Sequence, residues 1–308
     1  AAIYKGSWQG KRVLDGKQVD FISTYFDDQM TSGNPYPLAA NAEKSFQGSI
    51  VLGKGFVLEP TEAEALIARN PKNKDVLFPY LNGEDLNSRS DQSPSRWVIN
   101  FFDWPLNRET APEDYTGPVA ADYPDCLEIV ERLVKPERIT QTGDRGAQYW
   151  WQFLRIRGEL YRTIAPLKRV MVIVLHTKGF YLSFVSKQIV FSHALAVFAF
   201  DKYTDYTLCC SSFLEYWAWK NSSTLGGGTL RFSPSEAFET FPFPPGFEPN
   251  RDLGSFVSPC DSSLRTQLES LGERLDADRR EIMMKLDIGL TKLYNLYHNP
   301  ELSPSSVM

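Results

Sequence analysis

The chain is 308 residues long and carries 33 Lys and Arg residues against 38 Asp and Glu residues, which gives a net charge of −5. This negative balance excludes a global positive field that would attract any nucleic acid. Hydrophobic residues make up 42% of the sequence, an ordinary globular composition that excludes a disordered or fibrous chain.

The first hundred residues predict short strands and one short helix. Strands are expected near residues 13–14 and 19–25, and residues 49–58 alternate around two glycines as a hairpin with a tight turn would. Thr61 begins a capping box and is the predicted N-cap of a helix. The apolar, β-branched and aromatic residues 97–102 predict a buried strand.

The middle of the chain changes from acidic to basic and then becomes strand-rich. Residues 103–131 contain eight acidic residues, and the last part of this segment leads into a helix predicted from Pro124 to Pro136. An antiparallel sheet is predicted next, from three apolar runs at 169–175, 180–190 and 194–200. A helix is expected over 208–220.

The last quarter of the chain predicts helices. Ser233 and Pro234 open a second capped helix, and the proline-rich residues 241–245 form a stiff link after it. Beyond this link, leucine and isoleucine recur at spacings of three, four and seven between residues 264 and 296, which predicts one or two long amphipathic helices.

Several motifs that suggest catalysis are incomplete. Residues 48–55 match most of a phosphate-binding GxxxxGK motif, but Ser or Thr is missing after Lys54 and no helix follows. Residues 34–37 (NPYP) resemble the Asn-Pro-Pro-Tyr loop of adenine methyltransferases in the wrong order, and no glycine-rich cofactor loop precedes them. Neither the three separated histidines nor Ser211 belongs to a catalytic or metal-binding pattern. We therefore predict no catalytic and no metal-binding residues.

The cysteines and the hydropathy pattern bear on location. The four cysteines contain no CxxC motif, which argues against a zinc site or a dense disulfide framework and favours the reducing cytoplasm. No apolar run is long enough to span a bilayer, so no membrane partner is expected.

Residues 138–157 interleave arginines with aromatic residues. The planar guanidinium group of arginine matches the oxygens of phosphate and the acceptors of guanine, and aromatic rings stack on bases. The segment therefore suggests a local DNA-binding face, which an acidic protein can carry because phosphate contacts act over about 10 Å. The alternative is structural: Trp150 and Trp151 belong to the core, and the arginines lie on a solvated helix face.

A succession of short motifs, in a fixed order, resembles one protein group. The motifs are SFQG at 45–48, GKGF at 53–56, VLFPYLNGEDL at 76–86, RWVINF at 96–101, PER at 136–138, WWQF at 150–153, SS at 211–212, RFS at 231–233, TFPFP at 240–244 and IGLTKLYNLYH at 288–298. The chain resembles the large bacterial adenine DNA methyltransferases of the MmeI-like (type IIL) restriction–modification class and the related phage-defence methyltransferases of BREX and DISARM systems. Most of these motif residues are expected to serve the fold.

The resemblance implies an α+β fold with three parts. Residues 1–44 would be the tail of a preceding methyltransferase domain, residues 45–245 a β-rich target recognition domain, and residues 246–308 a helical C-terminal segment. Its partners would be double-stranded DNA and the methyltransferase domain of the same polypeptide. The chain would contain no cofactor site and no catalytic motif, because S-adenosylmethionine would bind to the parent protein.

The predicted DNA contacts combine the basic aromatic segment with polar loops around the predicted sheet. The loops are residues 177–179, 186–188 and 220–230. The predicted contact residues are Arg138, Arg145, Trp150, Trp151, Arg155, Arg157, Lys178, Lys187, Lys220 and Arg231. Two alternatives remain open: a protein–protein interaction module that uses the C-terminal helices, and an enzyme with a carboxylate pair in the acidic segment.

Overall fold

The structure, a computed structural model, describes residues 8–23, 28, 34–140, 145–226, 228–244, 250 and 259–299. It divides into two compact units, Ala1–Tyr36 and Pro37–Met308. The first unit contains an antiparallel hairpin of β1 (Arg12–Leu14) and β2 (Lys17–Val19). Asp15 and Gly16 connect the two strands with positive φ angles of 48° and 79°, as a two-residue hairpin turn requires. The first predicted strand is confirmed, whereas β2 ends well before residue 25, and residues 24–27 lie outside the described part.

The second unit is an α+β fold, as predicted. Its strands are β3 (Ser45–Gln47), β4 (Val57–Leu58), β5 (Leu77–Leu81), β6 (Arg96–Ile99), β7 (Val170–Val174), β8 (His176–Thr177), β9 (Ser183–Val185), β10 (Val190–Phe191), β11 (Leu195–Phe198), β12 (Ser223–Leu225) and β13 (Thr229–Arg231). Its α-helices are α1 (Pro60–Arg69), α2 (Gly83–Ser88), α3 (Pro124–Leu133), α4 (Lys135–Ile139), α5 (Arg145–Gln148), α6 (Gly158–Ile164), α7 (Tyr203–Cys209), α8 (Ser212–Asn221), α9 (Pro259–Leu286) and α10 (Leu290–Tyr297). Short 3-10 and π turns complete it, namely η1 (Ala39–Asn41), η2 (Lys54–Phe56), η3 (Pro71–Asp75), η4 (Ala120–Asp122) and η5 (Pro234–Phe238).

A four-stranded antiparallel sheet, in the order β3-β11-β7-β9, lies at the centre of this unit. Every residue of β7 is buried, which explains its unbroken apolar sequence. Val170, Val172 and Val174 belong to one core together with residues of α2 and α6. Met171 and Ile173 point to the opposite face and join a core with α7 and α8. Because side chains alternate along a strand, this one sheet separates two cores, and the antiparallel sheet predicted for residues 169–200 is confirmed.

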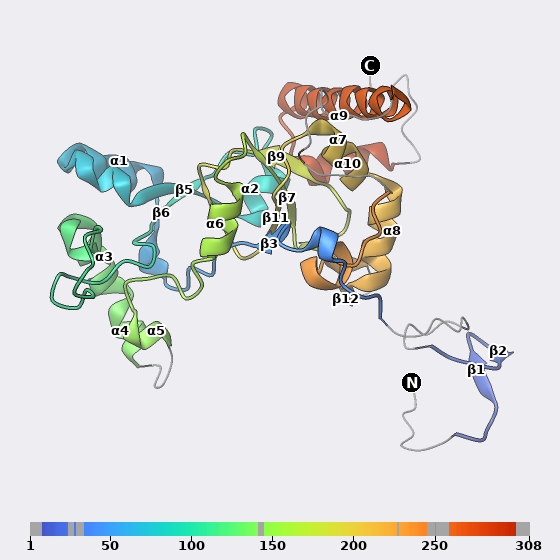
Figure 1. Cartoon of the computed structure of the whole chain (residues 1–308), viewed down its shortest axis with the longest axis horizontal. Helices are drawn as coiled ribbons and strands as arrows, with labels where there is room; N and C mark the ends of the chain where they lie inside the picture. Colours follow the sequence, from blue (N-terminus) through green and yellow to red (C-terminus); the bar gives the residue numbers. More distant parts are fainter. Residues whose placement is uncertain are drawn as a thin grey trace. The chain divides into compact units, whose positions relative to one another are not determined.

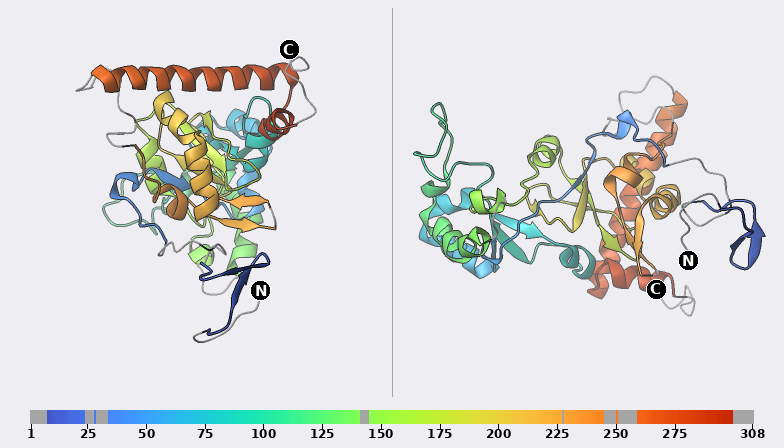
Figure 2. Two further views of the ribbon diagram at one scale, coloured as in Figure 1. Left: turned by 90° about the vertical axis from the view of Figure 1, so that its right-hand side faces the viewer. Right: turned by 90° about the horizontal axis from the view of Figure 1, so that it is seen from below.

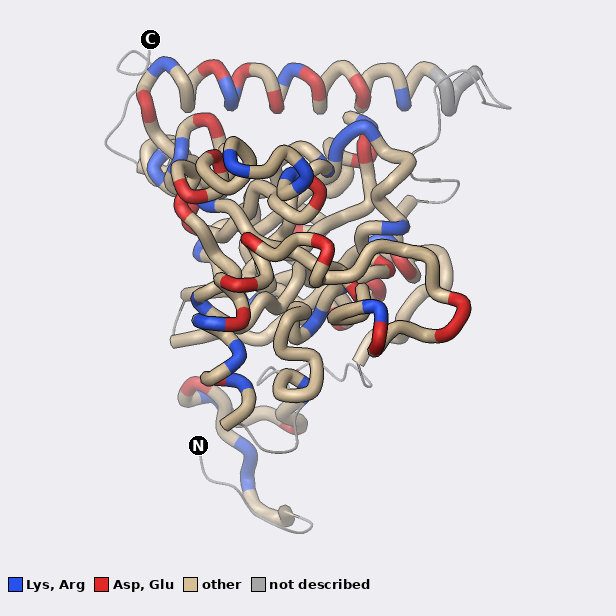
Figure 3. The backbone as a smooth tube through the Cα atoms, turned by 90° about the vertical axis from the view of Figure 1, so that its left-hand side faces the viewer, with Lys and Arg blue, Asp and Glu red and all other residues tan. Residues whose placement is uncertain are grey.

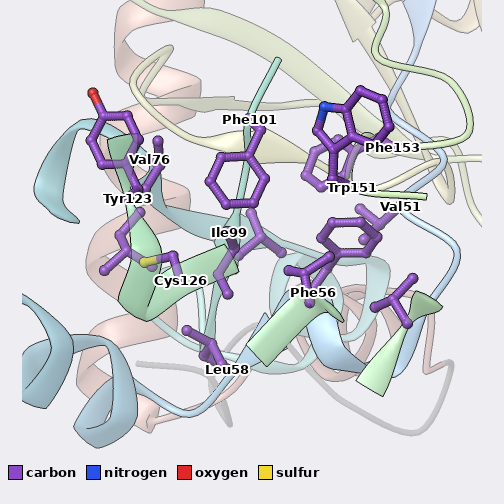
Figure 4. Packing of buried hydrophobic residues seen from close by; sticks show 14 of the residues in the cluster. Val51, Phe56, Leu58, Val76, Ile99, Phe101, Tyr123, Cys126, Trp151 and Phe153 are labelled. Carbon is purple, nitrogen blue, oxygen red and sulfur yellow. The ribbon is translucent and has the colours of Figure 1, made fainter. Parts of the chain in front are cut away.

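A second sheet, in the order β10-β5-β6-β4, supports what we call the first core. α1 and α3 pack beside it, and Figure 1 places them at the end of this unit opposite α7 to α10. Aromatic side chains of distant segments meet in the first core, where Phe56 and Phe153 pack edge to face at 5.3 Å between ring centroids (Figure 4).

Some local predictions for the first core are wrong. Residues 49–58 do not form a hairpin, because Ser49 and Ile50 bridge to Ser192 and Arg155 and only β4 pairs with β6. α1 is capped by Glu59 rather than Thr61, since Glu62 accepts a hydrogen bond from the Glu59 N–H at 2.8 Å.

Two predicted helices in the middle of the chain are divided differently in the structure. α3 ends at Leu133, and Pro136 lies in the first turn of α4, where proline is tolerated. The helix expected over 208–220 is split into α7 and α8, because Ser211 adopts an extended conformation and becomes the N-cap of α8.

The C-terminal segment forms the two helices α9 and α10, as predicted. α9 packs along α7, and Figure 2 shows it lying across the remainder of this unit as one long helix. Gly272 permits the close approach of α9 to α7, because a Cβ atom there would lie 2.5 Å from the backbone carbonyl oxygen of Tyr203. The predicted division after residue 245 stays a prediction, but α9 shares its compact unit with the sheet.

Three properties of the described residues concern membranes, metal ions and disulfides. None of the described helices is both long and apolar enough to cross a bilayer. The described residues also hold no cluster of His, Cys, Asp and Glu that could bind a metal ion. The described thiols Cys126, Cys209 and Cys210 are free.

Candidate nucleic-acid interface

Arg138 is a residue of the first core and cannot contact DNA where it lies. Only 2% of its surface is exposed. Its guanidinium group donates to the carbonyl oxygens of Gln152 at 2.6 Å, Val51 at 2.8 Å and Leu52 at 3.1 Å. It therefore ties the 51–52 segment to the 149–152 segment, and our prediction that it contacts DNA is wrong.

The two adjacent tryptophans are also core residues. Trp150 and Trp151 are 6% and 7% exposed, and Trp151 points into the same cluster as Phe153 (Figure 4). The indole N–H of Trp151 donates to the carbonyl oxygen of Trp104 at 2.9 Å, which satisfies its polar edge. For these residues the structural alternative holds, and they are not available to stack on bases.

The remaining arginines of the basic aromatic segment surround a pocket, which we call the arginine pocket. It has a volume of about 310 Å³ and is lined by Arg145, Arg155 and Arg157, with the carboxylates of Asp103 and Glu159 beside them. Arg145 and Arg155 are exposed, and Arg157 is half-buried. Within the described residues, none of these arginines forms an ion pair with either carboxylate.

Hydrogen bonds hold the wall of the arginine pocket in place. Ile50 and Arg155 exchange backbone hydrogen bonds at 3.0 and 3.2 Å. The Ser49 hydroxyl donates to the Ile156 carbonyl oxygen at 3.0 Å and lies 3.2 Å from the hydroxyl of Tyr161, which accepts from the Phe191 N–H at 3.2 Å.

The Tyr161 hydroxyl is the donor in its contact with Ser49. The single hydroxyl hydrogen of Ser49 is directed to Ile156, so the hydrogen between the two side chains belongs to Tyr161. Burial raises the pKa of Tyr161 to about 12, which keeps this donor protonated at neutral pH. The pocket wall is therefore a fixed surface rather than a free loop.

A second basic surface lies on a three-stranded sheet with the order β12-β13-β8. We call this sheet the ribbon. Thr177 and Leu230 are paired and buried, whereas the neighbouring pair His176 and Arg231 is exposed. Lys178 follows Thr177 and is exposed as well. Because alternate residues of a strand share a face, His176, Lys178 and Arg231 lie on the solvent face of the ribbon.

The predicted specificity loops are only partly brought together. Residues 177–179 and 220–230 meet at the ribbon, and the second of these is a hairpin rather than a polar loop. Lys220 is half-buried at the end of α8, directly before β12.

Residues 186–188 lie elsewhere. They follow Val185, which pairs with Val170, whereas β8 follows the opposite end of β7. Lys187 is half-buried and donates to the Ala165 carbonyl oxygen. The loop at 186–188 therefore does not share the ribbon surface.

Positively and negatively charged residues are interspersed on the C-terminal helix α9. Lys, Arg, Asp and Glu alternate along α9, so this helix offers no continuous basic stripe (Figure 3). The sequence analysis found no role for His176 and did not single out the supporting residues Ser49 and Tyr161. Only the alternation of buried and exposed residues along β8 could have singled out His176.

No known protein family matches the chain, and no curated protein matches it. Its fold is similar to that of a chain in the structure of the type IIL restriction–modification enzyme MmeI in complex with DNA. The TM-score is 0.58 over 94% of this chain, at 15% sequence identity. This chain spans about a third of the length of that one, 34%. At this identity the similarity concerns the fold.

Proposed function

We propose that this chain is a recognition module that binds double-stranded DNA and reads a short sequence within it. The observation that carries the proposal is the uncovered basic face of the ribbon, with His176, Lys178 and Arg231 on one side of a narrow sheet. A two-stranded β-ribbon fits the major groove of B-DNA. Within this three-stranded sheet the β12-β13 hairpin has that form, and the Arg231 fork on it can bind the O6 and N7 atoms of guanine. The fold of a chain solved with DNA supports the same conclusion.

The module would serve a larger adenine DNA methyltransferase of the restriction–modification or phage-defence kind. The motif order of the sequence supports this. We expect the methyltransferase domain of the same polypeptide to bind S-adenosylmethionine and the flipped adenine. The isolated chain should then release no heat when titrated with that cofactor in a calorimeter, and saturable micromolar binding would contradict this assignment.

A protein-binding role for the C-terminal helices is the second candidate. Leu264 and Leu271 on α9 are 57% and 47% exposed, which is high for leucine on an amphipathic helix. Such an apolar surface would bind its partner with little dependence on salt. DNA binding instead weakens steeply as salt rises, because each phosphate contact releases counterions.

The test is selection of duplexes from a random-sequence library by the wild-type chain, followed by sequencing. We expect one enriched motif, and an Arg231→Ala variant should relax it at one position by about 1–3 kcal/mol, or roughly 5- to 150-fold. Arg274→Ala on α9 makes the same charge change away from the ribbon and should leave the motif unchanged. Enrichment of no motif by a folded wild-type chain would refute sequence reading.

A further inference from the structure

The residues that line the arginine pocket carry more positive than negative charge. Arg145, Arg155 and Arg157 contribute three positive charges, and Asp103 and Glu159 contribute two negative ones. The guanidinium group of Arg145 lies over the ring of Tyr149, 5.4 Å from its centroid. Within the described residues none of the three arginines forms an ion pair, so this pocket favours an anionic ligand although the chain has a net charge of −5.

The backbone of Arg157 adopts an unfavourable conformation. Its φ angle is 60°, in the left-handed region that is unfavourable for a residue with a side chain. One terminal nitrogen donates to Gln47 Oε1 at 3.0 Å, and Gln47 donates in turn to the His193 carbonyl oxygen at 2.8 Å. The Nε atom is buried and has no hydrogen-bond partner within the described residues.

This combination is typical of a functional position rather than a structural one. Backbone strain and an unsatisfied buried donor both lower stability, and they persist where a ligand uses them. The backbone that carries Arg155 and Arg157 is fixed by the Ile50 and Ser49 hydrogen bonds described above, and the bond to Gln47 holds the Arg157 guanidinium group before any ligand arrives.

We propose that the arginine pocket binds one phosphate group of the DNA backbone, whatever the base sequence. Guanidinium groups bind phosphate oxygens through paired, charge-assisted hydrogen bonds, which provide geometry as well as affinity. The contact fixes the position of the chain on the duplex while the ribbon reads the bases. This inference rests on the proposed DNA-binding function.

The experiment measures the dissociation constant of a mixed-sequence duplex against salt concentration. Each phosphate contact contributes about 0.9 to the slope of log affinity against log salt. We expect Arg155→Ala to lower the magnitude of the slope by up to about 0.9. The double variant with Arg145→Ala should lose no more than about 0.9 in total, because both residues bind the same phosphate. Arg155→Lys should keep the slope and bind several-fold more weakly, since it keeps the charge without the fork.

The controls separate the possible failures. Arg274→Ala should leave the slope unchanged. If the wild-type chain fails to bind duplex at all, the proposed function is wrong, and this inference falls with it. If wild type binds but Arg155→Ala keeps the full slope, this inference alone is overturned. A loss of about 1.8 in the double variant would mean two separate phosphates and would overturn the single-phosphate site.

The source of the phosphate is tested by competition. Inorganic phosphate at constant ionic strength should displace the duplex no better than chloride does. Saturable displacement that Arg155→Ala abolishes would assign the pocket to free phosphate rather than to DNA.

Arg157→Gly distinguishes a binding residue from a structural one. Glycine accepts the left-handed conformation without strain, which offsets the loss of the hydrogen bond to Gln47, so the melting temperature should change little while DNA affinity falls several-fold. A lower melting temperature with unchanged affinity would show that Arg157 serves the fold, and would contradict its place in the phosphate site.

Discussion

Arg138 and Arg155 belong to the same basic aromatic segment, but their surroundings differ in every respect. Arg138 is buried, and its guanidinium group is surrounded by carbonyl oxygens at 2.6–3.1 Å from Gln152, Val51 and Leu52. Arg155 is exposed at the edge of a pocket with no carboxylate paired to it. The guanidinium group of Arg138 has its hydrogen-bond partners inside the protein, whereas that of Arg155 faces solvent and is open to a ligand.

Whether unpaired backbone carbonyl oxygens lie nearby decides whether an arginine is buried in the core or remains exposed. Leu52 has a φ angle of 43° and Gly53 one of 133°, so the chain turns there without pairing its carbonyl oxygens in a sheet. Arg138 satisfies these oxygens, and their removal from water would otherwise be costly. The wall around Arg155 has already used its backbone groups in the bridge to Ile50.

The largest effect is expected from Arg138→Ala. The substitution leaves several buried carbonyl oxygens without a donor, so the free energy of unfolding should fall by about 3–5 kcal/mol. Urea denaturation measures it. Arg155→Ala is the matched control, and as a surface change it should alter the same quantity by less than about 0.5 kcal/mol. Equal losses in the two variants would erase the distinction between the two arginines.

Gly53→Ala tests the turn that presents those carbonyl oxygens. An added Cβ atom would lie 2.9 Å from a methyl group of Val134, in a backbone conformation that alanine rarely adopts. We expect a loss of about 1–3 kcal/mol. The double variant with Arg138→Ala should lose less stability than the sum of the two single losses, since both substitutions act on the Leu52 carbonyl. Full additivity would show that the turn and Arg138 act independently.

Asp205 is a buried carboxyl group with too few hydrogen-bond and ionic partners to stabilise its charged form. Burial raises its pKa to about 7; Glu269 and Asp201 add to this, while the Asn250 N–H at 2.8 Å and Arg265 oppose it. The folded state therefore holds a proton that the unfolded chain has lost above about pH 4. Stability should fall as pH rises from about 4 to 7, by up to about 1.4 kcal/mol per pH unit, and then level off.

Asp205→Asn carries no such proton and should not show this fall. Urea denaturation at several pH values between 5 and 8 compares the two proteins, and the variant should gain on wild type as pH rises. Curves that stay parallel over this range would contradict the raised pKa.

The smallest effect is expected from Tyr161→Phe, which removes a hydroxyl behind the arginine pocket. The Phe191 N–H loses its acceptor, so we expect a loss of about 1 kcal/mol. DNA affinity should fall less than in Arg155→Ala, since the guanidinium groups remain. A larger loss of affinity than in Arg155→Ala would mean that the wall, rather than the arginines, makes the DNA contact.

Elements whose burial is set by local sequence were predictable. The apolar run of β7 predicted a buried strand, and the leucine pattern of α9 predicted a helix; both elements are confirmed. The amphipathic face expected for α9 is not, because Leu264, Leu271 and Leu275 are exposed. The hairpin expected over 49–58 failed because Ser49 and Ile50 pair with residues more than a hundred positions away, and no local pattern carries that information.

The candidate site was predictable in composition but not in arrangement. Sequence marked Arg138 and Arg155 alike, because an arginine among aromatic residues suits a core and a DNA surface equally well. Which of the two is buried depends on carbonyl oxygens of Val51 and Leu52, far away in sequence. The ribbon likewise exists only because β8 meets a hairpin that begins more than forty residues later.

The pairing of β3 with β11 has a consequence during protein synthesis. Gln47 pairs with Ala196, about 150 residues later in the chain. At 5–20 residues per second, the ribosome needs roughly 8 to 30 s to supply the partner strand. Over that interval residues 45–47 lack their partner strand, and the apolar strand β7 is made before β11, with which it also pairs. The nascent chain is thus most exposed to aggregation just before residue 198 emerges, and a delay in translation there would prolong that exposure.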